Sequence, residues 1–150
     1  MRQTMTQPPR SNCMLMPALR RTVGQARSYS RWVLGTWRLE SMADTVELLV
    51  SELVTNAIDA TGITDEEPDY GRLVGKVKPI YLCLSALAET LKIEVWDASS
   101  TPPLKRVATE EDEGGRGLVL VQAMSKEWGC EVLDTGGKIV WCECLIGEVE

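Results

Sequence analysis

Apolar residues recur at two different spacings along the chain, and these spacings predict where helices and strands lie. Apolar residues three and four apart predict helices over residues 23–37 and 44–61. Asp44 is the expected N-cap of the second helix, and Gly62 is the expected stop signal. A third helix is predicted over residues 116–125, directly after Gly114 and Gly115.

Short apolar or alternating runs predict five strands, over residues 13–18, 79–86, 90–96, 128–133 and 138–145. A short turn at 87–89 joins the second and third strands, and Gly136 and Gly137 lie in the turn of a final hairpin. Because helices and paired strands come in blocks, the predicted fold class is α+β. We expect a two-layer α/β sandwich, with a mostly antiparallel sheet covered on one face by about three helices.

Length and composition indicate one soluble globular domain. The chain has 150 residues, of which 25% are charged. We expect residues 1–12 to be a disordered tail and residues 13–147 to form the domain. Apolar runs are too short to cross a bilayer, and an N-terminal signal core is missing, so no membrane contact and a cytoplasmic location are expected. Two loops are predicted, over 62–78 and 99–115.

The cysteines carry two expectations. Their odd number, five, predicts reduced thiols. Cys142 and Cys144 are two apart on the last strand, with Cys130 on its hairpin partner. This grouping fits buried thiols on one sheet face better than a metal site, which would need a fourth ligand.

Charge is unevenly placed along the chain. Residues 1–39 hold seven Arg and no other charged residue, whereas residues 40–150 hold nine Lys or Arg against 22 acids. The basic region could dock an acidic protein partner or could be a solvated tail and helix face. The acidic body argues against direct nucleic-acid binding. The absence of histidine excludes Ser-His-Asp and Cys-His catalysis, and also histidine autophosphorylation.

The second helix carries an unusual polar pair. Glu52 and Asn56 are four residues apart, so their side chains lie on one helix face. A carboxylate beside a carboxamide suits a site where one group accepts a proton and the other offers an oxygen to a metal ion.

Two further motifs follow along the chain. Asp97 directly follows a predicted strand and precedes a small-residue turn, so it either accepts a hydrogen bond from an amine such as that of adenine or only caps the turn. The run Gly114-Gly115-Arg116-Gly117 precedes a helix, where backbone N–H groups can approach phosphate. It matches neither the Walker nor the G-x-G-x-x-G pattern, and a flexible hinge is the alternative.

Together, in this order, the three motifs resemble the anti-sigma-factor serine kinases of the GHKL (histidine kinase-like) ATPase superfamily. The likeness is to stand-alone regulators abundant in filamentous actinobacteria, and it covers about residues 13–145. The matching segments are Glu52–Ala57, Val95–Ser99, Gly115–Val121 and Gly137–Trp141.

The resemblance implies a role for each matching residue. Asn56 would be the protein ligand of Mg²⁺, and Glu52 the general base for a partner's serine hydroxyl. Asp97, with Ser99, would bind the adenine of ATP. The segment from about Leu104 to Gly114 would be the lid. Secondary candidates are Lys105 and Ile139, and the phosphate-binding residues would be Gly114, Gly115, Arg116, Gly117 and Leu118.

The resemblance implies an ATP-dependent serine/threonine kinase that acts in transcription regulation. Its substrate would be an anti-sigma-antagonist (STAS-type) protein, and it would also bind a sigma factor. A homodimer through the first helix and first strand is implied as well. The alternative is a nucleotide-binding module that sequesters a sigma factor without catalysis. Two departures motivate it: Ile139 stands where the family commonly has Thr, and the chain lacks a His common near residues 59–60. A third possibility is a regulatory domain that has lost ATP.

Overall fold

The computed structural model describes residues 9–61, 75–102 and 113–147, with the backbone alone for 113–118. The elements in chain order are β1 (Arg10–Pro17), α1 (Thr22–Thr36), the short 3₁₀ helix η1 (Glu40–Met42), α2 (Ala43–Thr61), β2 (Pro79–Ala86), β3 (Thr90–Asp97), α4 (Glu113–Met124), β4 (Glu127–Val132) and β5 (Lys138–Leu145). In the part of the chain that is described, no helix is long and apolar enough to cross a membrane.

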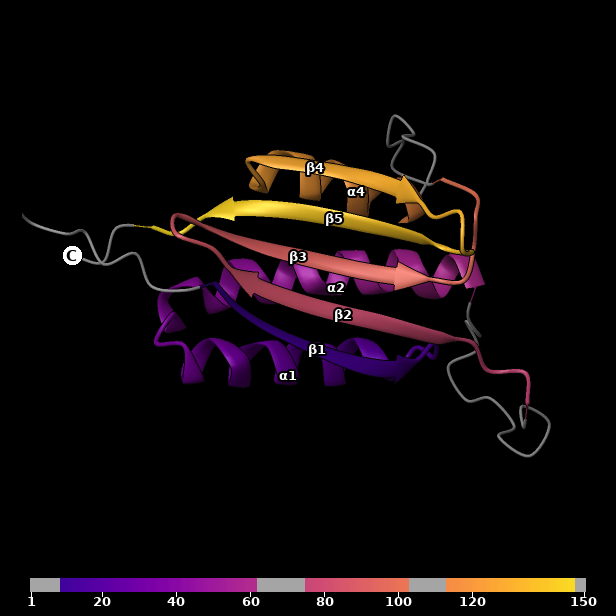
Figure 1. The fold of residues 1–150 in the computed structure, drawn as a ribbon, viewed down its shortest axis with the longest axis horizontal. Coiled ribbons are helices and arrows are strands. Elements are labelled where there is room, and N and C mark those ends of the chain that lie inside the picture. Colours follow the sequence, from indigo (N-terminus) through magenta and orange to yellow (C-terminus); the bar gives the residue numbers. More distant parts are fainter. Residues whose placement is uncertain (1–8, 62–74, 103–112, 148–150) are drawn as a thin grey trace, which may run out of the picture.

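The five strands form one sheet in the order β1-β2-β3-β5-β4, and every neighbouring pair is antiparallel. Helices α1, α2 and α4 lie on the same side of this sheet (Figure 1). The predicted α+β class and the two-layer arrangement are therefore confirmed. Successive side chains along β3 and β5 point to opposite faces of the sheet, one towards the helices and the next away from them.

Most element boundaries agree with the predicted ones to within a single residue, and three of the differences change the interpretation of the sequence. Strand β1 begins at Arg10, which pairs with Ala86, so residues 10–12 of the expected tail belong to the sheet. Helix α2 begins at Ala43, which places Asp44 in the first helical turn instead of at the N-cap. Helix α4 begins at Glu113, three residues before the predicted start, because the helical backbone continues through the glycines.

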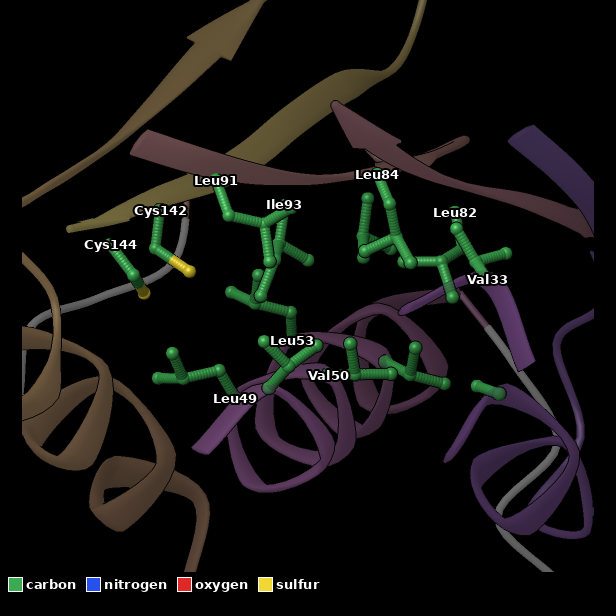
Figure 2. Close-up of a cluster of buried hydrophobic side chains, with 14 of the residues drawn as sticks. Val33, Leu49, Val50, Leu53, Leu82, Leu84, Leu91, Ile93, Cys142 and Cys144 are labelled. Atoms are coloured by element: carbon green, nitrogen blue, oxygen red, sulfur yellow. The ribbon is translucent and has the colours of Figure 1, made fainter. Parts of the chain in front are cut away.

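The core lies between the helices and the covered face of the sheet. Every apolar residue of the predicted stripe on α2 is at most 2% exposed, from Val46 to Ile58. Figure 2 shows Leu49, Val50 and Leu53 of this helix facing side chains of the strands. Full burial of one such side chain stabilises the fold by roughly 1.5–3 kcal/mol. The stripe therefore fixes which face of α2 meets the sheet, and hence the direction of its polar residues.

Two of the cysteine predictions can be compared with the structure. Cys142 and Cys144 are free thiols, buried on the covered face, as predicted (Figure 2). Within the described ranges, no group of three or more His, Cys, Asp or Glu could hold a metal ion.

The prediction that all five cysteines are reduced is wrong. Cys13 of β1 and Cys83 of β2 lie directly opposite each other in the antiparallel pair, and a disulfide joins them. The two residues are 70 positions apart in the chain, so an odd cysteine count could not indicate that the fold places them together.

The hairpin between β4 and β5 requires glycine at its end. Gly137 has a φ of +82°, a backbone conformation that costs strain for other residues. A Cβ atom there would lie 2.4 Å from the backbone oxygen of Asp97 and 2.6 Å from the Trp96 ring. The chain therefore enters β5 in close contact with the end of β3.

Gly137→Ala should destabilise the fold by about 2–4 kcal/mol, since it adds a backbone clash to the strain of a positive φ. The matched control is Gly136→Ala, because Gly136 has a φ of +108° but no atom within 4 Å of the position that an alanine methyl group would take. It should cost only about 1–2 kcal/mol. Urea unfolding measures both, and equal losses would contradict the close approach at Gly137.

Candidate functional site

The elements that carry the motifs meet at one end of the molecule. In Figure 1 the end of α2, the end of β3 and the start of β5 lie at the same end, where α4 also begins. Helix α2 contacts both β3 and α4. Glu52 is at the middle of α2, Asn56 lies in its second half, and Asp97 is the last residue of β3. The fold therefore brings together elements that are far apart in the sequence.

Asp97 is fully buried, and its two carboxylate oxygens have different surroundings. Oδ1 accepts hydrogen bonds from the Ser99 backbone N–H, at 2.8 Å, and from Nζ of Lys138, at 2.9 Å. Oδ2 is buried and has no hydrogen-bond partner among the residues that the structure describes. Both interpretations of Asp97 therefore agree with the structure: one oxygen caps the turn, and the other is available to a ligand.

Lys138 is the partner that brings a positive charge to this site. It lies opposite Asp97 in the β3–β5 ladder, and its side chain is only 1% exposed. Burial raises the pKa of the nearby Cys130 thiol. The positive charge of Lys138 lowers this pKa, and the negative charge of Asp97 raises it. The pair therefore forms a buried ion pair that reaches the region between β3, β5 and β4.

Asn56 provides a second buried oxygen without a partner. Its side chain is half-buried, but Oδ1 is shielded from solvent and makes no hydrogen bond within the described ranges. A buried carbonyl oxygen left unpaired costs about 1–3 kcal/mol, so such atoms need an explanation. An amide oxygen is a hard ligand of the kind that Mg²⁺ prefers. The donor set thus fits Mg²⁺ held by one protein oxygen together with the phosphates of a nucleotide.

Glu52 lies one helical turn before Asn56 and is also half-buried. Burial raises the pKa of its carboxyl group above the ordinary value of 4.5. No hydrogen bond or ion pair joins it to another residue in the described ranges. A carboxylate whose pKa is raised and whose oxygens no described residue occupies can accept a proton from a hydroxyl group.

The structure places the other predicted residues as follows. Ser99 contacts Asp97 through its backbone N–H. Ile139 lies opposite Trp96 and, by the alternation along β5, on the face away from Asp97. Lys105 and the lid up to residue 112 lie outside the described residues. The backbone of Gly114, Gly115, Arg116, Gly117 and Leu118 forms the first part of α4.

Sequence reasoning missed Lys138. The signal was present, because Val140, Cys142 and Cys144 are the buried residues of the last strand and Lys138 is in phase with them. The same alternation places Ile139 on the other face. A lysine in phase with core residues at the start of a strand therefore indicates a buried cation near the end of its neighbour.

The chain was also compared with known proteins. The model of a family described as "Histidine kinase-like ATPase domain" matches residues 16–143. No curated protein matches the chain. The matched range runs from β1 into β5 and includes Glu52, Asn56, Asp97 and Lys138.

Proposed function

Because the chain belongs to the histidine kinase-like ATPase domain family, we propose that it binds ATP with Mg²⁺ and phosphorylates a serine of an anti-sigma-antagonist (STAS-type) protein. The observation that carries the proposal is a pair of buried oxygens, Oδ2 of Asp97 and Oδ1 of Asn56, for which the described residues offer no hydrogen-bond partner. They offer an acceptor for a base amine and a ligand for a hard cation at the same end of the fold.

The roles of these side chains follow from their chemistry. Asp97 accepts a hydrogen bond from the amine of the base through Oδ2, while Ser99 and Lys138 hold Oδ1. Asn56 holds Mg²⁺ through its amide oxygen. ATP supplies the phosphoryl group, and Mg²⁺ neutralises charge on its phosphates. Backbone N–H groups at the start of α4 (Glu113–Met124) would bind the phosphates, since a helix N-terminus favours anions.

Glu52 is the proposed general base. Its carboxylate lies one turn from Asn56 and is not occupied by another described side chain. It would orient the serine hydroxyl of a bound partner and accept its proton as the new O–P bond forms. Because the chain has no histidine, it cannot phosphorylate itself on histidine, and the proposed acceptor is a serine of the partner protein.

A second candidate function is a nucleotide-binding module that sequesters a sigma factor without catalysis. One observation favours it: no described residue holds the Glu52 carboxylate in a fixed orientation. A catalytic base is usually positioned by a neighbouring group. In this case the ATP site would control the conformation of the sigma-binding surface only.

Incubation with γ-labelled ATP and candidate antagonists separates the two functions. The kinase proposal predicts labelled phosphoserine on one antagonist. ATP binding without transfer to any of the cell's antagonists would reject the kinase and leave the sigma-binding module.

Asn56→Ala should weaken binding of MgATP by about 10- to 100-fold, as expected for loss of a metal ligand. In the presence of a chelator, the variant and the parent should bind metal-free ATP equally. Stability should not fall much, because the deleted oxygen has no hydrogen bond to lose. Isothermal titration measures the affinities.

The matched control is Thr55→Ala, at an exposed position on the same helix. It should leave MgATP affinity unchanged. An Asn56→Ala variant that loses affinity equally with and without Mg²⁺ would contradict the metal-ligand role.

A further inference from the structure

Lys138 is an unusual residue for the position it occupies. Lysine is almost never fully buried unless it is paired, and burying an ion pair often costs more than its attraction returns. The side chains of Lys138 and Asp97 are nevertheless only 1% and 0% exposed, and Nζ of Lys138 lies 2.9 Å from Oδ1 of Asp97. An apolar pair of similar size at this register would serve the core at least as well. The ion pair therefore calls for an explanation beyond stability.

The hydrogen-bonding capacity of the pair is only partly used. The Lys138 ammonium group has three N–H donors, and the structure joins it to one described acceptor, Oδ1 of Asp97. Oδ2 of Asp97 is buried, and no residue in the described part of the chain donates to it. The pair thus presents a donor and an acceptor next to each other at the end of the β3–β5 ladder.

The register of the two strands brings Lys138 and Asp97 together. Gly137 passes so close to the Asp97 backbone that a methyl group would not fit between them. The ladder then places Lys138 directly opposite Asp97. Nζ of Lys138 lies 2.9 Å from Oδ1 of Asp97, so the donor and the acceptor are neighbours in the structure.

A donor beside an acceptor matches the Watson–Crick edge of adenine, which offers an amine at N6 and an acceptor at N1. Proteins read unpaired bases through this edge. Hypoxanthine offers the reverse order, an acceptor at O6 and a donor at N1. It can satisfy the same pair only if the ring is turned over, which would direct its ribose away from the phosphate end of the site.

We propose that Lys138 is a specificity-determining residue that donates a hydrogen bond to N1 of adenine while Asp97 accepts one from the 6-amino group. This inference rests on the proposed ATP site and adds a second, direct reader of the base. Lys138 therefore has two roles: it holds Asp97 in place, and it rejects nucleotides without an acceptor at position 1.

The test compares ATP with 1-deaza-ATP, in which N1 is replaced by C–H, on the unaltered protein and on Lys138→Met. On the unaltered protein, 1-deaza-ATP should bind about 10- to 100-fold more weakly, since a charged donor is left unpaired. ITP should bind at least as weakly as 1-deaza-ATP. On Lys138→Met, ATP should weaken, and the ratio between ATP and 1-deaza-ATP should fall to about one.

A purely structural role for Lys138 gives a different result. The variant would lose affinity or stability, but the unaltered protein would bind ATP and 1-deaza-ATP equally, and this would overturn the inference. Equal binding of the two nucleotides by the unaltered protein overturns the inference even if Lys138→Met does not fold, whereas the fall of the ratio in Lys138→Met assigns the donor to Lys138. Absence of ATP binding would reject the proposed function as well, so the two failures are distinguishable.

Discussion

Glu52→Gln should reduce phosphate transfer to the partner serine by about 10²- to 10⁴-fold, the range expected for loss of a general base. The amide has nearly the shape of the carboxylate but cannot accept the proton of the hydroxyl group. MgATP affinity should change little, because Glu52 is assigned no contact with the nucleotide. Single-turnover transfer from γ-labelled ATP, together with a separate titration of MgATP, measures the two effects.

The same variant has an expected effect on stability with a defined pH dependence. Because burial raises the pKa of Glu52 in the folded state, the folded protein binds this proton more tightly than the unfolded chain does. The penalty for the ionised group is absent well below pH 4.5, develops as pH rises from about 4.5 towards the raised pKa, and is complete above that raised pKa. Glu52→Gln should therefore match the parent at low pH and be slightly more stable at neutral pH.

A variant that loses transfer but is also less stable at neutral pH would point to a structural role for Glu52 instead. Glu47→Gln is a suitable control, since Glu47 is on the same helix but its carboxylate pairs with Arg31. It should leave transfer unchanged.

Asp97→Asn should weaken ATP binding by at least about 100-fold and destabilise the fold by about 3–5 kcal/mol. The stability loss arises because the Lys138 ammonium group stays buried without a counter-charge. The binding loss has a geometric cause. Ser99 N–H and Lys138 both donate to the Oδ1 position, so the amide oxygen must lie there. The amide NH₂ then replaces Oδ2 and faces the adenine amine, donor against donor.

A double variant separates these two effects. Adding Lys138→Met to Asp97→Asn removes the buried charge and should recover most of the stability. ATP binding should remain lost, because the Ser99 N–H still fixes the orientation of the amide. Urea unfolding and calorimetry measure the two quantities, and recovery of ATP binding in the double variant would contradict the role given to Oδ2.

The fold was predictable where one physical requirement decides the structure. The apolar stripe of α2 has helical spacing because only one face of that helix meets the sheet, and every residue of the stripe is buried as expected. The alternation along β3 likewise identified a strand with one covered face. The start of α4 was not predictable in this way, because glycines usually indicate a turn and here the helix continues through them.

The candidate site was predictable only in its separate parts. Glu52 and Asn56 are adjacent because of local helical geometry, which the sequence specifies. The ion pair between Asp97 and Lys138 depends on the register of two strands whose paired residues are 41 positions apart, and the sequence does not state that register. The disulfide between Cys13 and Cys83 depends on register in the same way.

The central claim is that the buried oxygens of Asp97 and Asn56 form an ATP site. Isothermal titration of the full chain with MgATP tests it most directly, with ITP as the matched control ligand. The account predicts binding of one MgATP per chain and much weaker binding of ITP. Absence of heat and of any thermal shift with MgATP, at protein and ligand concentrations that would reveal micromolar binding, would contradict it.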